Sequence, residues 1–182
     1  MRTLPVTLTL LFASLGVVDA ETTSQNAPVG LQQELIQIRQ LLINPPEGEL
    51  SDLKAAVSNH SADPARALMQ LAGDQTNLAR VRILSLALLS EYPDAEVKSY
   101  LLSLIEDESA HPTFRGWALQ SYARGFADAE PDQVRAVVTP YLSDLEPGLR
   151  ARAEMSMEYM VQNRSAGGSD PMKPMISLLL QD

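Results

Sequence analysis

Three residue types that make a hydrolase triad, a serine, a histidine and an aspartate, occur within six positions at Ser58, His60 and Asp63. In a triad the histidine accepts the serine proton and the aspartate orients the imidazole ring. Residues of these types that lie so close together in sequence commonly cap a helix or stabilise a turn instead. The sequence therefore favours a capping role here and predicts no catalytic residue.

Candidate metal ligands are equally sparse, since the chain has two histidines without ligand spacing and no cysteine. Asp128, Glu130 and Asp132 alternate as they would at the start of a calcium-binding loop. Gln133 and Thr139 stand where such a loop needs glycine and glutamate. We expect the acidic run to lie at the positive end of a helix. The sequence predicts neither a metal nor another cofactor.

The composition indicates one ordinary globular domain that does not bind nucleic acid. The chain has 182 residues, of which 45% are hydrophobic, and a net charge of −9. Phosphate binding needs a concentrated lysine and arginine surface, which an acidic chain of this kind does not offer overall. The absence of cysteine also excludes disulfides and a cysteine nucleophile.

The amino terminus is typical of an export signal. Arg2 precedes an apolar run from Leu4 to Val18, and Val18-Asp19-Ala20 offers small residues at the −3 and −1 positions of a cleavage after Ala20. The run is shorter than the ~20 residues that a membrane-spanning helix needs. We expect residues 1–20 to be a cleaved signal peptide and residues 21–28 a flexible tether, and the mature domain, residues 29–182, to be periplasmic or secreted without a stable membrane anchor.

One short pattern recurs four times along the remainder of the chain. An apolar pair and one spacer residue are followed by an aspartate, at Asp74, Asp107, Asp144 and Asp182. Recurrence at intervals of 33, 37 and 38 residues is typical of a helical solenoid. No segment alternates with the period of two that a strand requires. The predicted fold is all-α, a short right-handed α-solenoid of antiparallel helix pairs.

Apolar periodicity, prolines and capping residues give the expected helices. Two starting helices cover about 31–42 and 49–59, and each later pair has a first and a second member. The first members are residues 63–74, 94–107, 131–144 and 171–182, and the second members are residues 77–91, 112–127 and 147–162. We expect the last helix, 171–182, either to cap the open end of the stack or to contact a partner.

The second helices share a short pattern, an arginine with small or apolar residues at fixed positions after it. The pattern comprises Phe114-Arg115 with Ala118 and Tyr122, and Leu149-Arg150 with Ala153 and Met157, and Arg80 stands at the matching place one unit earlier. In this pattern the chain resembles the HEAT-like repeats of the phycobilisome-lyase type. Arg80 and Arg150 follow the preceding aspartate by six residues and Arg115 by eight, which predicts a two-residue insertion before Arg115. The resemblance implies an α-solenoid used as a binding surface and carries over no catalytic residue.

The repeated aspartates and arginines are expected to form a structural framework. An arginine that bonds the aspartate, or the carbonyls that close the previous helix, would tie adjacent turns together. The framework residues are Asp74, Arg80, Asp107, Arg115, Asp144 and Arg150. The expected core comprises Leu68, Leu71, Leu84, Leu88, Leu101, Leu104, Ala118, Tyr122, Val138, Leu142, Ala153 and Met157.

A candidate binding row follows when the second helices are aligned on the framework arginines. Positions two, five and nine residues later share one helix face, and arginine and aromatic side chains are common at binding hot spots. The candidate residues are Arg82, Trp117, Gln120, Arg124, Arg152 and Tyr159. The alternative is that Trp117 belongs to the core and that the arginines are merely solvated.

Two classes of function remain open. The first is a non-enzymatic scaffold that binds a protein or peptide along the face carrying Trp117. The second is an accessory or maturation factor of an enzyme, a lyase-like helper, or a weak enzyme. An enzyme would show titratable groups converging in a deep pocket, whereas a scaffold would show an open groove or a flat face.

Overall fold

The computed structural model of the protein describes residues 29–46 and 50–164. Within these ranges the chain is all-helical and contains no strand, as the sequence predicted. The predicted signal peptide, the tether and the last predicted helix, 171–182, lie outside the described residues. None of the helices in the described part combines the length and the apolar character needed to cross a membrane.

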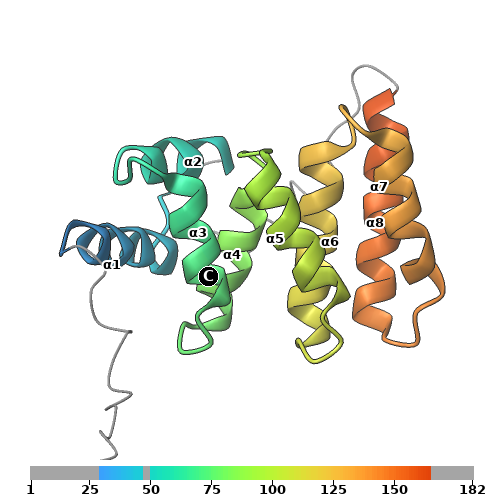
Figure 1. The fold of residues 1–182 in the computed structure, drawn as a ribbon, viewed down its shortest axis with the longest axis horizontal. Helices are drawn as coiled ribbons and strands as arrows, with labels where there is room; N and C mark the ends of the chain where they lie inside the picture. Colours follow the sequence, from blue (N-terminus) through green and yellow to red (C-terminus); the bar gives the residue numbers. More distant parts are fainter. Residues whose placement is uncertain (1–28, 47–49, 165–182) are drawn as a thin grey trace, which may run out of the picture.

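The helices of the described chain form a repeat-like series (Figure 1). They are α1 (Val29–Ile43), α2 (Leu50–Ser58), α3 (Pro64–Gly73), α4 (Ala79–Leu89), α5 (Ala95–Glu106), α6 (Pro112–Phe126), α7 (Pro131–Val138), the 3₁₀ helix η1 (Thr139–Ser143) and α8 (Pro147–Arg164). α3 packs on α4, α5 on α6, and α7 on α8. The second helices also pack on each other, α4 on α6 and α6 on α8, while α1 lies against α3 and α4.

Successive helix pairs meet at two junctions. The first junction is the contact of the α3–α4 pair with the α5–α6 pair, and the second junction is the contact of the α5–α6 pair with the α7–α8 pair. The turns inside the three pairs all lie along the lower edge of the view (Figure 1). Corresponding turns are therefore on the same edge of the structure.

The helices begin with the capping groups that the sequence predicted. The Asp63 carboxylate accepts from the backbone N–H of Arg66 at 3.1 Å, and the Asp94 carboxylate accepts from that of Val97 at 2.8 Å. Such bonds satisfy N–H groups that have no partner inside the helix. Proline, which lacks an N–H, stands at the first position of four helices, at Pro64, Pro112, Pro131 and Pro147.

One predicted helix is shorter than expected. The sequence predicted a single helix over 131–144, but α7 ends at Val138 and the chain continues as η1. Pro140 accounts for the change, because it has no N–H to donate to the carbonyl four residues earlier and its ring crowds that carbonyl. The Thr139 hydroxyl bonds the Arg135 carbonyl at 2.7 Å at the point of change.

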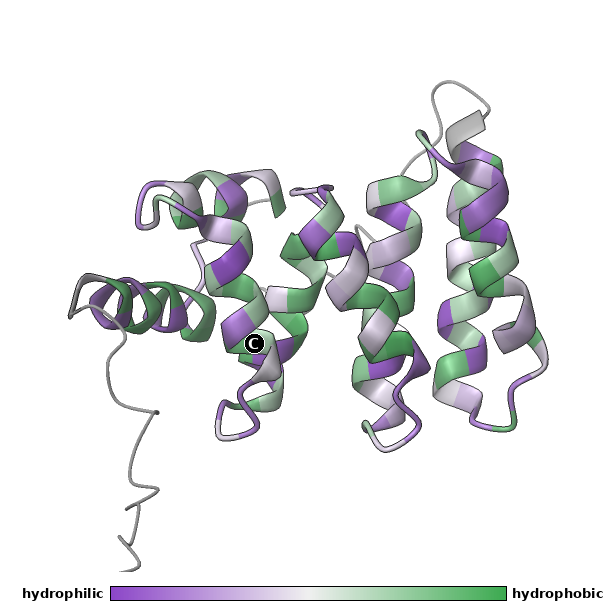
Figure 2. Ribbon diagram, in the orientation of Figure 1, coloured by the Kyte–Doolittle hydropathy of each residue, from purple (hydrophilic) through white to green (hydrophobic). Residues whose placement is uncertain are grey.

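The core follows the row of second helices. All predicted core residues except Leu104, Leu142 and Met157 are buried, and these three are half-buried against the same cluster. Figure 2 shows hydrophobic residues on the helices and mainly hydrophilic residues on the turns. Burial of each leucine stabilises the fold by about 1.5–3 kcal/mol. The core therefore runs through the series and holds the turns at both junctions in place.

Candidate functional site

Three arginines, one on each second helix, bond backbone carbonyls where the first helix of the same pair ends. The bonds are Arg82 Nε to Ala72 O at 2.8 Å, Arg115 Nε to Ile105 O at 3.0 Å, and Arg150 Nη1 to Asp144 O at 2.6 Å. Each arginine is the fourth residue of its helix, because α4, α6 and α8 begin at residues 79, 112 and 147. Carbonyls at a helix end lack partners within the helix, so these bonds complete the turn.

Arg80 does not take the framework position predicted for it. Its Nε is buried and has no hydrogen-bond partner among the described residues, and Arg82 makes the expected contact. Arg82 and Arg115 both follow the preceding aspartate by eight residues, whereas Arg150 follows Asp144 by six. The prediction of an insertion before Arg115 is therefore wrong, and the turn before α8 is instead two residues shorter than the other two.

The framework aspartates hold the turns and are not bonded by the arginine side chains that follow them. Each accepts from the backbone N–H two residues later at 2.9 Å, in the pairs Asp74–Thr76, Asp107–Ser109 and Asp144–Glu146. The Thr76 and Ser109 hydroxyls also donate to the same carboxylates, at 2.7 Å and 2.6 Å. These hydroxyl and N–H bonds lower the pKa of Asp74 and of Asp107 below the ordinary value of 3.8.

The centre of the predicted binding row lies inside the protein. Trp117 is 2% exposed and Gln120 is 1% exposed. The Arg152 guanidinium stacks on the Trp117 ring, 3.7 Å from its centroid, and donates to Gln120 Oε1. The expectation of an exposed row is therefore wrong at Trp117 and Gln120, and the alternative placement of Trp117 in the core is confirmed.

Arg152 occupies a largely apolar environment between α6 and α8. Burial lowers its pKa to about 10, which leaves the guanidinium charged at neutral pH. The close approach needs Gly116, since a Cβ there would lie 2.9 Å from Arg152 Cγ and 3.7 Å from a methyl of Leu149. The cation, the tryptophan and the glycine together close the second junction.

The other members of the predicted row lie away from this cluster. Arg124 forms an ion pair with Glu91 at 3.0 Å, and Lys54 lies 3.6 Å from the same carboxylate, so α2 and α6 are both joined to the turn that follows α4. Tyr159 is half-buried against the core. Arg82 belongs to the first junction, so the six residues predicted as one row are divided among separate surroundings.

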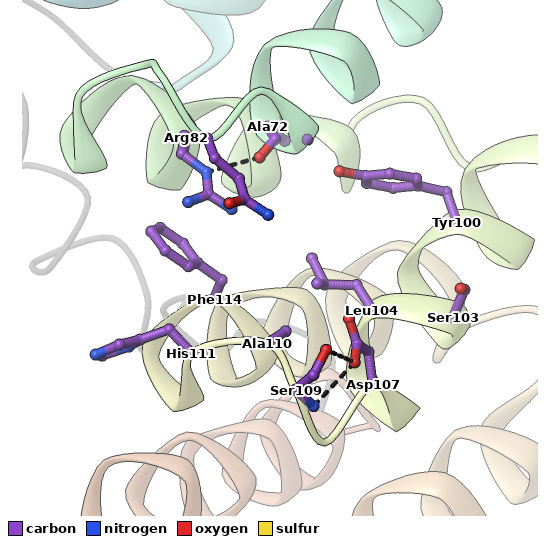
Figure 3. Close-up of a pocket in the computed structure, with 12 residues that line it drawn as sticks. Ala72, Arg82, Tyr100, Ser103, Leu104, Asp107, Ser109, Ala110, His111 and Phe114 are labelled. Carbon is purple, nitrogen blue, oxygen red and sulfur yellow. Dashed lines mark hydrogen bonds between the residues drawn. The ribbon is translucent and has the colours of Figure 1, made fainter.

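A pocket opens at the first junction, between the α3–α4 turn and the helices α5 and α6. Its volume is about 440 Å³. It is lined by Ala72, Gly73, Gln75, Arg82, Tyr100, Ser103, Leu104, Asp107, Ser109, Ala110, His111 and Phe114. In Figure 3, Arg82 and Tyr100 approach it from one side, and Asp107 and Ser109 lie on the other.

Two hydrogen-bond donors in this pocket have no acceptor within the described chain. Arg82 uses Nε for Ala72 O and stacks on Phe114 at 3.7 Å from the ring centroid, which leaves its two terminal nitrogens without an acceptor. The Tyr100 hydroxyl likewise donates to no described residue, and burial raises its pKa while the Arg82 cation opposes that shift. Gly73 lies beside this hydroxyl, and a Cβ there would be in ordinary contact with it at 3.7 Å.

The pocket also contains a serine, a histidine and an aspartate, but they do not form a triad. The Ser109 hydroxyl donates to Asp107, and His111 Nδ1 accepts from the Thr113 N–H at 3.2 Å. A triad needs the histidine between the serine and the aspartate. Here His111 caps α6 and Asp107 closes a turn, so the arrangement is structural.

The residues first considered for chemistry also have structural contacts. The Ser58 hydroxyl bonds the Tyr92 hydroxyl at 2.9 Å, and Asp63 caps α3. Glu130 forms an ion pair with Lys98. No group of three or more metal-ligating side chains that could hold an ion occurs in the described ranges 29–46 and 50–164.

Sequence and structure comparisons identify no relative. The chain matches no protein-family model, no curated protein and no solved structure.

The pocket residues that sequence reasoning missed were Tyr100, Leu104, His111 and Phe114. Leu104 was assigned to the core, and the other three were assigned no binding role. The available signal was the equal spacing from Asp74 to Arg82 and from Asp107 to Arg115, which aligns the two turns that face each other across the pocket.

Proposed function

We propose that the protein is an exported, non-enzymatic scaffold that binds a protein or peptide at the first-junction pocket. The observation that carries this proposal is an open pocket between two helix pairs, where the terminal nitrogens of Arg82 and the hydroxyl of Tyr100 have no acceptor among the described residues. Donors that lack a protein acceptor at an accessible surface bond water, which a ligand can replace. The side chains of a possible triad are engaged in capping and turn bonds.

The repeat correspondence supports the scaffold as a HEAT-like α-solenoid. Aligned on their hydrogen-bonded arginines, the second helices read Val81-Arg82 with Ser85, Phe114-Arg115 with Ala118, and Leu149-Arg150 with Ala153. The apolar residue, the arginine and the small residue three positions later thus recur in all three. Solenoids of stacked repeats commonly bind partners along an extended surface.

Selection of peptides tests the proposed function. Random peptides displayed on phage are selected on the mature chain, residues 21–182, and then counter-selected on the Leu104→Tyr variant, which places a larger side chain in the pocket. The Arg135→Gln variant on α7, where the arginine side chain is 43% exposed, serves as a control for loss of positive charge. We expect peptides that bind the wild type and Arg135→Gln but not Leu104→Tyr. Peptides that bind all three equally, or the failure to select any, would contradict the proposal.

Export is tested separately. When the full chain is expressed in a bacterium, the protein recovered from the periplasm should begin at Glu21, after the predicted cleavage at Ala20. An uncleaved chain confined to the cytoplasm would refute this part of the proposal and would leave the pocket unaffected.

A further inference from the structure

We infer that the first-junction pocket recognises a carboxylate on a peptide, held by the terminal nitrogens of Arg82 and the hydroxyl of Tyr100. This inference rests on the proposed function and adds the chemical group that the pocket selects. Both donors line the same side of the pocket and neither has an acceptor among the described residues. An arginine matches a carboxylate in geometry, because two parallel N–H groups can bond both oxygens.

Arg82 is held in position before any ligand binds. Its Nε is fixed on Ala72 O at 2.8 Å, and its planar face lies on the Phe114 ring. A side chain that is already ordered loses less rotamer freedom on binding. The stack on Phe114 also shields one face of the guanidinium from water, which strengthens its interaction with an anion. The two Nη atoms remain for the ligand.

The charge of the site suits a group with a single negative charge. Arg82 is the one arginine among the twelve lining residues, which include no lysine. A phosphate monoester carries about −1.5 to −2 charges at neutral pH and is usually held by a cluster of arginines. The whole chain has a net charge of −9, so a more highly charged anion would be repelled. A carboxylate requires one guanidinium and one further donor.

The opposite side of the pocket suits the rest of a peptide. Asp107, held in its turn by Ser109, presents a carboxylate whose pKa is lowered by those hydrogen bonds, so it accepts N–H groups at neutral pH. Leu104 and Phe114 supply apolar surface between the two sides (Figure 3). A ligand with an acid, an apolar side chain and an amide N–H complements all three, and a peptide contains all of them.

The test compares small ligands that differ in one group. N-acetylphenylalanine, its amide, and the α-amide of N-acetylglutamic acid are titrated into the mature isotope-labelled protein and followed by NMR. N-acetylphenylalanine represents the carboxylate of a chain terminus, and the glutamic acid derivative represents that of an acidic side chain. We expect at least one acid to shift the Arg82 Nε–Hε and Tyr100 signals, with an affinity at least tenfold above that of the amide. Equal affinity of acids and amide, or shifts only outside the pocket, would overturn the inference.

Variants separate binding from folding. Tyr100→Phe removes one donor and keeps the ring, and we expect a three- to tenfold loss of acid binding with unchanged thermal stability. Arg82→Gln is expected to abolish acid binding; if that variant does not fold, Tyr100→Phe and the acid–amide comparison still decide. Unchanged acid binding in Tyr100→Phe would refute the role of its hydroxyl. If the acids bind but no peptide is selected, the carboxylate site is retained and the scaffold function is refuted. If peptides are selected that bind regardless of their carboxylates, the scaffold function is retained and the carboxylate site is refuted.

Discussion

At the first junction Arg82 bonds Ala72 O beside an open pocket, whereas at the second junction Arg115 makes the same bond to Ile105 O beside the Tyr141 ring. Leu104 and Tyr141 stand in equivalent positions, each three residues before a framework aspartate. The Tyr141 hydroxyl bonds Ile105 O at 3.3 Å, while Leu104 makes no such bond and lines the pocket. The tyrosine of the second junction thus makes a structural contact, whereas the equivalent leucine of the first junction lines a candidate binding site.

The two stacked arginines differ in the same way. Arg82 on Phe114 and Arg152 on Trp117 have equal ring distances of 3.7 Å. Arg152 donates to the buried Gln120, whereas the terminal nitrogens of Arg82 have no acceptor among the described residues. An arginine–aromatic pair therefore does not by itself mark a binding site, and the partners left to the guanidinium decide its role.

The largest effect on stability is expected at the second junction. Trp117→Ala removes a buried ring and the stack on Arg152, and should lower the free energy of unfolding by about 3–5 kcal/mol. Phe114→Ala, at the half-buried ring of the first junction, should lower it by about 1–2 kcal/mol. Urea unfolding of both variants measures the difference. Equal losses of unfolding free energy would contradict the view that the second junction is closely packed and the first is not.

A smaller loss is expected where α6 approaches α8. Gly116→Ala places a Cβ 2.9 Å from Arg152 Cγ. Overpacking typically destabilises by about 1–3 kcal/mol, and the better helix propensity of alanine offsets roughly 1 kcal/mol of that. Gly30→Ala in α1 is the matched control, because its Cβ would meet nothing within 4 Å. A net loss of about 1 kcal/mol is expected for Gly116→Ala and none for Gly30→Ala; no loss in either would show that the approach is not tight.

Exchange of the equivalent residue should make the second junction resemble the first. Tyr141→Leu removes the hydrogen bond to Ile105 O and the ring beside Arg115, and should lower the free energy of unfolding by about 1 kcal/mol. The Arg115–Ile105 bond should remain. Urea unfolding measures the loss, and a crystal structure of the variant would reveal whether a cavity opens. A variant with full stability and no cavity would show that Tyr141 does not fill the second junction.

The smallest effect concerns acid stability of the turns. Asp74 and Asp107 have pKa values below 3.8 in the folded protein. As the pH falls, these carboxylates are therefore protonated in the unfolded chain before they are protonated in the folded protein. Their contribution is therefore complete above the ordinary pKa and is lost as the pH drops through 3.8 and below. Asp74→Asn and Asp107→Asn should flatten the fall in melting temperature between roughly pH 5 and pH 2. An unchanged slope in both variants would contradict these shifts.

The sequence predicted the helices and much of the core well because each signal was local. Capping aspartates, first-turn prolines and leucine spacing depend on neighbouring residues, and Asp63, Asp94 and Leu84 lie as predicted. The proline that ends α7, Pro140, is a local signal too, but the predicted helix over 131–144 continued past it.

The candidate site was harder to predict because it depends on contacts between helices. Either of two arginines of α4, Arg80 and Arg82, could take the framework position after Asp74. Only the bond from Arg82 to Ala72 O shows which of them does. Burial of Trp117 depends on Arg152, which lies on another helix, and on the close approach of the two helices at Gly116. The sequence pattern of α6 reveals neither contact. Spacing alone therefore identified the repeat but not which side chains face a pocket.

The most direct test of the account fills the first junction with the residue that the second junction uses. A peptide selected on the wild type is titrated calorimetrically into the wild type and Leu104→Tyr, with Arg135→Gln as the control. We predict at least tenfold weaker binding to Leu104→Tyr, unchanged binding to Arg135→Gln, and similar unfolding midpoints for all three proteins. Equal affinity for the wild type and a fully folded Leu104→Tyr would contradict the assignment of the first-junction pocket as the binding site.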